Sequence, residues 1–287
     1  MSHVRRIDRD RAGYPERLSD LHDPPQRLFA VGSLGEALGW SGPAVAIVGS
    51  RRAADASLRL TRELAGAAAA QGALVISGLA LGVDAAAHEG ALGVAGATLA
   101  VLGCGPDIAY PRTNRRIYAD IVSSGLVVSE FAPGTEPAPW RFPARNRIIA
   151  ALADAVVVVE ARQRSGALIT ADLALELGRD VLAVPGWPSF AGAAGTNGLL
   201  KAGAGLIEGP EDLLAWVGLE AGPAPRRSAA LQDEPLLAAL REQAGHPDEL
   251  AGRLGMAAGE VAAGLVRLEI EGMLSRDADG RWVAVVR

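Results

Sequence analysis

The amino-acid sequence predicts an α/β fold in which a doubly wound, mostly parallel sheet is followed by a small second domain. Three observations predict it. Short apolar runs alternate with helical patterns between residues 43 and 217, several runs have no polar interruption, and a loop with glycine or proline follows each. Such strand–helix repeats give parallel sheets whose strands are buried on both faces. At 287 residues, with 49% hydrophobic and 21% charged residues, the chain can hold one large core and a further small domain.

Residues 1–42 are expected to form a cap on the sheet, with a short helix, a stop at Pro24 and Pro25, and a short strand at 27–31. The charged N-terminal residues argue against a signal peptide, and no membrane span is expected. The one cysteine, Cys104, excludes an internal disulfide and favours a cytoplasmic location.

Seven strands are predicted between residues 43 and 217, each before a loop that is a candidate for function. They lie at 45–48, 74–76, 98–102, 126–128, 156–159, 181–184 and, more weakly, 206–207. In a parallel sheet of this kind, ligands bind beyond the carboxyl ends of the strands.

The first of these loops is typical of an anion site. Gly49 allows a sharp turn, Ser50, Arg51 and Arg52 follow, and a helical pattern begins after Asp55. A strand, a tight turn and a helix present backbone N–H groups to a phosphate. The two arginines stand where a nicotinamide-binding motif carries glycines, so that motif is absent.

Five loops predicted at the same edge carry basic residues without acidic neighbours. These residues are Arg51 and Arg52; Arg112, Arg115 and Arg116; Arg141, Arg145 and Arg147; Arg162 and Arg164; and Lys201, the sole lysine. A single arginine is more often a solvated surface group, and some are expected to pair with Glu130 or Glu160. Together, however, they predict a polyanion site that the net charge of −5 conceals.

The segment 139–155 adds aromatic side chains. Pro143 and Asn146 suit a helix start, and Trp140 and Phe142 lie just upstream of it. Cations, a helix N-terminus and flat rings suit single-stranded nucleic acid. Trp140 is equally suited to closing the core, whereas Phe142 favours binding.

At this point the sequence resembles a known family. GSRRAA at 49–54, SGLALGVDAAAH at 77–88, TLAVLGCGPDIAYPRTN at 98–114, SEFAPGTEP at 129–137, FPARNRIIAALADAVVVVEA at 142–161, SGALITADLALELGRDVLAVPG at 165–186 and GTNGLLKAGA at 195–204 resemble the bacterial DNA-processing protein A family. The resemblance implies an extended Rossmann-like fold that binds single-stranded DNA, forms a homodimer and helps to load a RecA-type recombinase during natural transformation. It implies no catalysis, and no cofactor or metal is expected.

The resemblance also implies a DNA pocket. Its residues would be Ser50, Arg51, Phe142, Arg145, Asn146, Ser165, Gly166 and Lys201. With Gly49, Arg52 and Arg147 from the loops above, they form the predicted interface, in which Arg51 is expected to matter most. Many members carry a helical domain before the core, and residues 1–42 are expected to hold only its exit.

Other polar residues suggest structural roles. Asp84 and His88 lie four residues apart, and we expect helix capping or buried hydrogen bonds rather than a metal site. Cys104 lies between two glycines and suits a tight turn rather than a nucleophile. Asn114 is expected to cap a helix.

After a linker predicted at 218–230, three helical patterns at 235–245, 247–254 and 257–273 precede two short strands with a turn at 279–280. Three helices and a hairpin predict a winged helix-turn-helix over residues 231–287. This region holds ten acidic residues against six arginines, and Glu260, Glu269 and Glu271 lie on the candidate recognition helix. Phosphate repels such a helix, so we expect the domain to contact protein, either a partner subunit or the recombinase.

Two other functions remain open. A nucleotide-cleaving phosphoribohydrolase of the same fold class could use Asp172 or Glu176 as its acid, although the double-glycine turn and paired glutamates of those enzymes are missing. A duplex-binding winged-helix regulator is disfavoured by the acidic charge. A role in recombinational repair fits as well as one in transformation.

Overall fold

The computed structural model describes residues 4–219, 235–270, 274–277 and 281–284. The chain divides into two compact units, residues 1–222 and 223–287, which are described separately.

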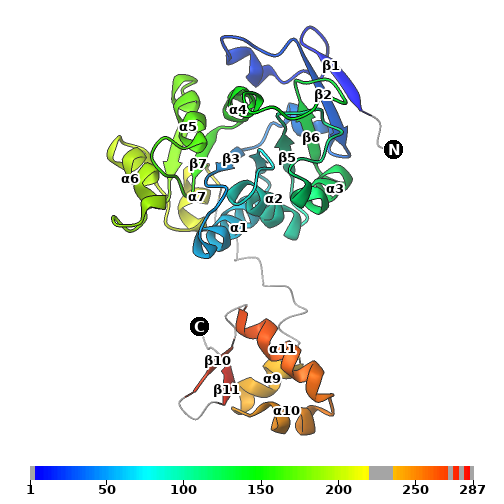
Figure 1. Cartoon of the computed structure of the whole chain (residues 1–287), viewed down its shortest axis with the longest axis vertical. Helices are drawn as coiled ribbons and strands as arrows, with labels where there is room; N and C mark the ends of the chain where they lie inside the picture. The colour runs from blue at the N-terminus through cyan, green and yellow to red at the C-terminus, as the bar shows by residue number, and fades with distance from the viewer. Residues whose placement is uncertain (1–3, 220–234, 271–273, 278–280, 285–287) are drawn as a thin grey trace. The chain divides into compact units, whose positions relative to one another are not determined.

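The first unit is built on a sheet of nine strands in the order β1-β2-β6-β5-β4-β3-β7-β8-β9 (Figure 1). The strands are β1 (Arg5–Asp8), β2 (Arg27–Gly32), β3 (Ala44–Val48), β4 (Leu74–Ser77), β5 (Thr98–Val101), β6 (Leu126–Ser129), β7 (Ala155–Val158), β8 (Asp180–Ala183) and β9 (Gly205–Leu206). Strands β3 to β9 are parallel, whereas β1 and β2 are antiparallel to their neighbours. The predicted doubly wound, mostly parallel sheet is confirmed.

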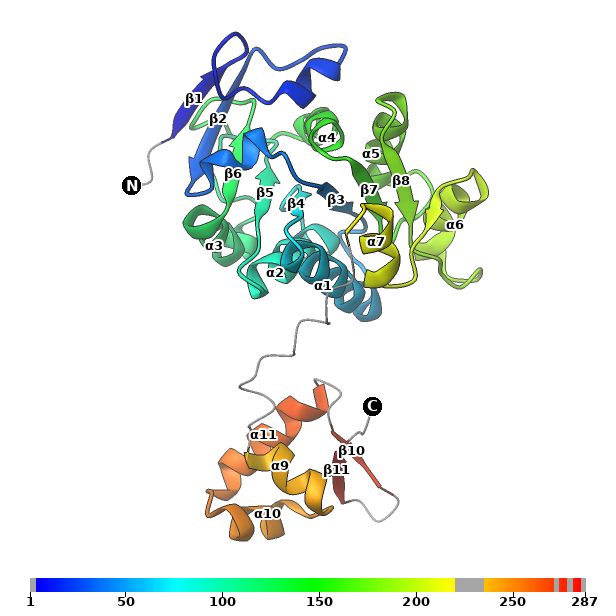
Figure 2. The same cartoon turned by 180° about the vertical axis from the view of Figure 1, so that it is seen from behind.

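Helices cover both faces of this sheet (Figure 2). One face carries α1 (Asp55–Ala70), α2 (Val83–Gly93), α3 (Arg115–Ser124) and α7 (Pro210–Trp216); the other carries α4 (Arg141–Leu152), α5 (Gly166–Glu176) and α6 (Ala194–Lys201). Alternate residues of β3 divide between the two layers. Val45 and Ile47 pack with Leu64 of α1, while Ala46 and Val48 pack with Ile148 of α4. The strand is buried on both faces because every residue in it is apolar.

The N-terminal segment differs from the expected cap. β2 and the unexpected strand β1 extend the sheet, and the 3-10 helices η1 (Glu16–Asp20) and η2 (Gly35–Gly39) lie in the same segment. β1 has the sequence RRID and is partly exposed, as an edge strand is, so it lacks the apolar run that identifies buried strands.

The second unit holds α9 (Pro235–Glu242), α10 (Pro247–Leu254) and α11 (Ala258–Ile270), with β10 (Leu274–Arg276) paired to β11 (Trp282–Ala284). Leu240, Leu250, Leu265 and Trp282 form its core. The three helices and the hairpin agree with the predicted winged helix. Most of the predicted linker, from residue 220, and the turn at 279–280 lie outside the described residues. No helix among the described residues is both long and apolar enough to cross a bilayer.

Candidate nucleic-acid interface

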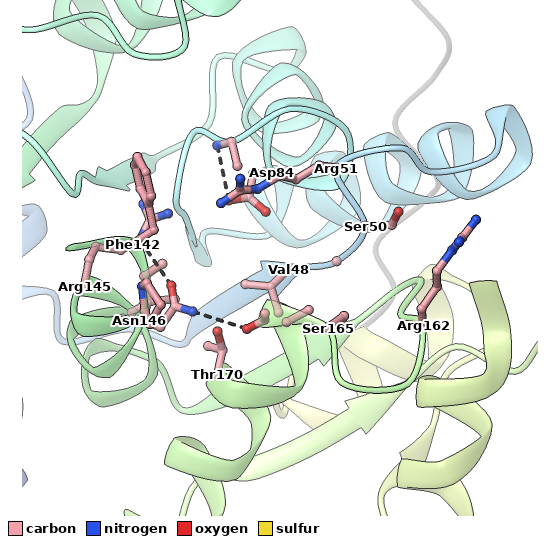
Figure 3. A pocket seen from close by; sticks show the side chains of 16 residues that line it. Val48, Ser50, Arg51, Asp84, Phe142, Arg145, Asn146, Arg162, Ser165 and Thr170 are labelled. Carbon is pink, nitrogen blue, oxygen red and sulfur yellow. Dashed lines mark hydrogen bonds between the residues drawn. The ribbon is translucent and has the colours of Figure 1, made fainter. Parts of the chain in front are cut away.

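A pocket of about 300 Å³ opens at the carboxyl edge of the sheet (Figure 3). The β3–α1 loop, the first turns of α4 and the β7–α5 loop surround it. Eight of the predicted interface residues line it: Gly49, Ser50, Arg51, Phe142, Arg145, Asn146, Ser165 and Gly166. Segments that are far apart in sequence therefore meet at one hollow, because their strands β3 and β7 are neighbours in the sheet.

The N-terminus of α5 forms one wall of this pocket. Ser165 is its N-cap residue, yet its side chain makes no capping hydrogen bond. The Ser165 Oγ atom is buried and has no hydrogen-bond partner among the described residues. The first N–H groups of a helix also lack partners within it and favour anions. On the same wall, Asn146 Nδ2 donates to the Gly166 carbonyl at 3.3 Å, so α4 and α5 are tied together across the pocket.

Two exposed arginines lie at the rim. Arg51 stands over the Phe142 ring, with its guanidinium carbon 5.5 Å from the ring centroid. Arg162 lies on the side away from Phe142 (Figure 3). Within the described part of the chain, neither arginine forms an ion pair, so both charges face solvent or a ligand.

Phe142 also separates this pocket from a smaller hollow of about 70 Å³, which Leu81, Leu102 and Tyr110 help to line. The Tyr110 and Phe142 rings are stacked, with centroids 5.5 Å apart and planes 18° apart. Flat rings therefore lie directly beside the cationic rim, an arrangement that can hold a phosphate and an adjoining base together.

Arg145 forms the floor rather than the rim. Its side chain is buried, and its guanidinium donates to the carbonyls of Gly78, at 2.6 Å, and Val101. Burial lowers the pKa of Arg145, and the nearby carboxylate of Asp84 opposes that shift. Arg145 thus uses much of its donor capacity to hold the pocket together.

Asp84 belongs to the same floor, where its carboxylate accepts hydrogen bonds from the backbone N–H groups of Gly78, at 3.1 Å, and Ala80, at 3.3 Å. Burial raises its pKa, against the attraction of Arg145. The expected buried hydrogen-bond role of Asp84 is confirmed.

The N-terminus of α1 is closed, unlike the anion site that the GSRR turn suggests. The carboxylate of Glu160 accepts from the Ala54 N–H at 2.9 Å and from the Ser57 hydroxyl at 2.8 Å. The Glu160 side chain is buried and comes from the end of β7, so an internal carboxylate already occupies the place where a phosphate would bind.

Several predicted residues do not reach the pocket. Arg52 is exposed and lies outside the lining. Arg147 forms an ion pair with Glu130 at 2.5 Å, as the sequence allowed. Lys201 ends α6, which returns to the amino edge before β9 begins, so it lies at the opposite end of the sheet. The other basic loop residues outside the lining are Arg112, Arg115, Arg116, Arg141 and Arg164.

Further polar residues can now be assigned. His88 Nδ1 is 2.8 Å from the Thr98 hydroxyl, which donates to Val75, so the expected buried hydrogen bond of His88 is confirmed. Burial raises the pKa of Cys104 to about 11, which disfavours a thiolate nucleophile. Asn114 bonds the carbonyls of Leu79 and Ala80 rather than capping α3.

Trp140 does not close the core, because 63% of its surface is exposed. Its ring packs edge-on against Phe131, with centroids 5.9 Å apart. Among the described residues there is no cluster of three or more His, Cys, Asp or Glu side chains that could hold a metal ion.

Sequence reasoning treated Arg162 only as one basic residue among several, and it assigned Ser165 through resemblance alone. A serine directly before an apolar helical run is itself an N-cap signal, and this signal predicts the helix N-terminus that forms this wall of the pocket.

The family model described as DNA recombination-mediator protein A matches residues 5–218, and the DprA winged helix domain matches residues 220–280. The chain is 37% identical to protein Smf of Synechocystis sp., covering 95% of this chain and 78% of that protein. It is 42% identical to DNA processing protein DprA of Streptococcus pneumoniae, over 70% of each chain.

Two solved structures are also similar to this chain. DprA of S. pneumoniae superposes with a TM-score of 0.69 at 39% identity, covering 74% of both chains. DNA processing protein A of Helicobacter pylori, whose structure concerns its single-stranded DNA binding mode, has a TM-score of 0.67 at 31% identity, over 76% of this chain and 97% of that one. With both units matched, the chain belongs to the DNA recombination-mediator protein A (DprA) family.

Proposed function

We propose that the pocket binds single-stranded DNA, with a phosphate at the N-terminus of α5 and a base against Phe142. One observation carries the proposal. The Ser165 hydroxyl, which has no partner among the described residues, and the N-terminus of α5 line the same pocket as Arg51, Arg162 and the Phe142 ring. Free N–H groups, cations and an aromatic plane are the combination that an unpaired strand requires. The single-stranded DNA binding of the H. pylori relative supports the proposal that this pocket binds single-stranded DNA.

A single strand suits the site better than a duplex. The Phe142 ring lines two hollows, and a base can reach such a ring only when it is unstacked and unpaired. The described residues of the winged-helix unit offer exposed acids, among them Asp248, Glu249 and Glu260, which disfavour contact with duplex phosphates.

The test is the affinity of the full chain for a single-stranded oligonucleotide and for the duplex of the same sequence, each measured over a salt series. Wild type should prefer the single strand. Arg51→Glu should lower single-strand affinity on the order of 100-fold and reduce the salt slope by about one. Arg52→Glu is the matched control, because this neighbouring arginine lies outside the pocket and should lose only a few fold.

Equal losses in the two variants would show that general surface charge, not the pocket, binds DNA. A preference for duplex would favour a winged-helix regulator instead.

We further propose that the chain acts in the cytoplasm as a homodimer that protects single strands and helps to load a RecA-type recombinase, in transformation or in repair. The family description as a recombination mediator supports this role. In this proposal the winged-helix unit contacts protein. An assay of recombinase assembly on protected single strands tests it: the wild type should accelerate assembly, and Arg51→Glu should not.

The proposed role involves no catalysis. Asp84 is the carboxylate that lines the pocket among the described residues, and its oxygen is held by two backbone amides. Asp172 and Glu176, which a phosphoribohydrolase could use as acids, are outside the lining. Release of a free base from nucleotides by the purified protein would contradict this proposal.

A further inference from the structure

The loop between β8 and α6 carries an exposed tryptophan that the proposed pocket does not use. Trp187 is 77% exposed, more than any other large apolar side chain among the described residues, and Phe190 in the same loop is 43% exposed. Exposing an indole to water is unfavourable, so a side chain so prominent favours a ligand with a flat, apolar face.

The loop is held in place at its base. The Asn197 side chain bonds both backbone groups of Gly186, donating to its carbonyl at 2.8 Å and accepting from its N–H at 3.1 Å. The Phe190 N–H donates to the Trp187 carbonyl at 2.9 Å, which closes the turn. Pro188 further restricts the backbone of Trp187. The indole is therefore presented from a fixed turn.

This loop also adjoins the wall of the pocket. The Gly195 N–H donates to the Ala161 carbonyl at 2.7 Å, one residue before Arg162. A Cβ atom on Gly192 would lie 2.9 Å from Oε1 of Glu160, the side chain that caps α1 beside Arg51. β8 is the second strand from β3 in the sheet, so the two strands lie about 10 Å apart at the usual strand spacing.

The segment that carries Trp187 has no negative charge of its own. Residues 181–207 contain no Asp or Glu, so no acidic side chain of this segment would repel a strand that leaves the pocket past Arg162.

We propose that Trp187 is a second base-stacking platform, which holds a nucleotide of the strand beyond the one at Phe142. The proposal rests on the proposed binding of single-stranded DNA at the pocket. It gives that interface a direction along the carboxyl edge, from Phe142 past Arg51 and Arg162 to Trp187.

The experiment measures the affinity of the full chain for oligo(dT) of increasing length. Trp187→Ala should equal wild type on the shortest oligomers that bind and should fall about tenfold behind on longer ones, because stacking of one base is lost. Trp187→Phe should keep most of the affinity. Trp216→Ala is the matched control: this half-exposed tryptophan bonds Asp180 at the amino edge and should match wild type at every length.

If Trp187→Ala binds every length of oligo(dT) as tightly as wild type does, the proposal is wrong, and the exposed indole is then better explained by contact with a protein partner. An equal loss at every length would also overturn it, because Trp187 would then act through the pocket. Arg51→Glu in the same series separates the two proposals. If Arg51→Glu binds as wild type does, the proposed pocket itself fails, whereas weak binding at all lengths leaves only the role of Trp187 in question.

Discussion

Two helices begin side by side at the carboxyl edge, and their N-termini differ. α1 follows β3, and at its start the Glu160 carboxylate accepts from the Ala54 N–H and the Ser57 hydroxyl, whereas α5 follows the neighbouring strand β7 and begins at Ser165, whose hydroxyl has no partner among the described residues. Both helices present N–H groups at the same edge. Of these two helices, only α1 has an internal carboxylate bonded at its start within the described part of the chain, and α5 has no side-chain cap there.

The difference teaches that a helix N-terminus becomes an anion site only where the protein supplies no carboxylate of its own. At α1 the internal carboxylate fixes the β3–α1 loop, and the loop in turn positions Arg51 over Phe142. At α5 the same chemistry is left for a ligand. In the proposed interface, one N-terminus therefore contributes stability and the other binds the phosphate.

The largest effect should come from making α5 resemble α1. Ser165→Asp places a carboxylate at the N-cap, which should stabilise the helix by up to about 1 kcal/mol while like charge repels phosphate. We expect single-strand affinity to fall on the order of 100-fold as thermal stability rises. Oligonucleotide binding and thermal unfolding, measured on one preparation, test the expected fall in affinity and the expected rise in stability.

Ser165→Asn is the control for that change, because it caps the helix without charge. It should retain more of the binding than Ser165→Asp does. If the Asp and Asn variants bind equally well, the N-terminus of α5 is not where phosphate lies.

The reciprocal change opens α1. Glu160→Gln keeps an acceptor for Ala54 and Ser57 but removes the charge, and charge-assisted hydrogen bonds are about twice as strong as neutral ones. Unfolding in urea should show a loss of about 1.5 kcal/mol, with single-strand affinity unchanged within a few fold.

Glu89→Gln serves as the comparison, since Glu89 pairs with Arg62 on the surface and should cost less than about 0.5 kcal/mol. A collapse of DNA binding in Glu160→Gln with stability intact would mean that Glu160 belongs to the interface.

A third helix at this edge, α2, allows stability to be varied without touching either N-terminus. His88 in α2 donates from Nδ1 to the Thr98 hydroxyl, its Nε2 has no partner in the part of the chain that the structure describes, and burial lowers its pKa to about 3. The folded protein therefore stays unprotonated at His88 below pH 6.5, while the unfolded chain gains a proton, so stability falls as pH falls.

Between pH 6.5 and 5.5 this histidine should account for about 1 kcal/mol of lost stability. Urea unfolding at the two pH values should show it, and His88→Gln should flatten the dependence. An unchanged slope in the variant would assign the pH effect to other groups.

The fold was predictable because the signal is local. Short, uninterrupted apolar runs such as 45–48, each followed by glycine or proline, favour strands buried on both faces. β1 was missed for the converse reason, since RRID at the exposed edge of the sheet carries no apolar pattern.

The site was predictable only in part, because its chemistry depends on contacts that sequence spacing does not contain. Glu160 closes α1 from about 100 residues away, and nothing in the GSRR turn indicates that. Arg147 lies two residues from Arg145 but bonds Glu130, and Lys201 is carried to the opposite edge by α6. The sequence predicts at which edge of the sheet a basic loop residue lies. It does not show whether an acidic side chain pairs with that residue, and this pairing decides whether the charge is free to bind DNA.

The smallest expected effect tests whether the Ser165 hydroxyl is reserved for a ligand. Replacing an N-cap serine with alanine usually costs about 1 kcal/mol, because a capping hydrogen bond is lost. Since Ser165 makes no such bond, Ser165→Ala should change the unfolding free energy by less than about 0.5 kcal/mol and weaken single-strand binding about threefold to tenfold. If stability is normal and binding is weaker, the hydroxyl contacts the DNA. If stability is lost and binding is unchanged, the hydroxyl caps α5, and the N-termini of α1 and α5 then differ less than proposed.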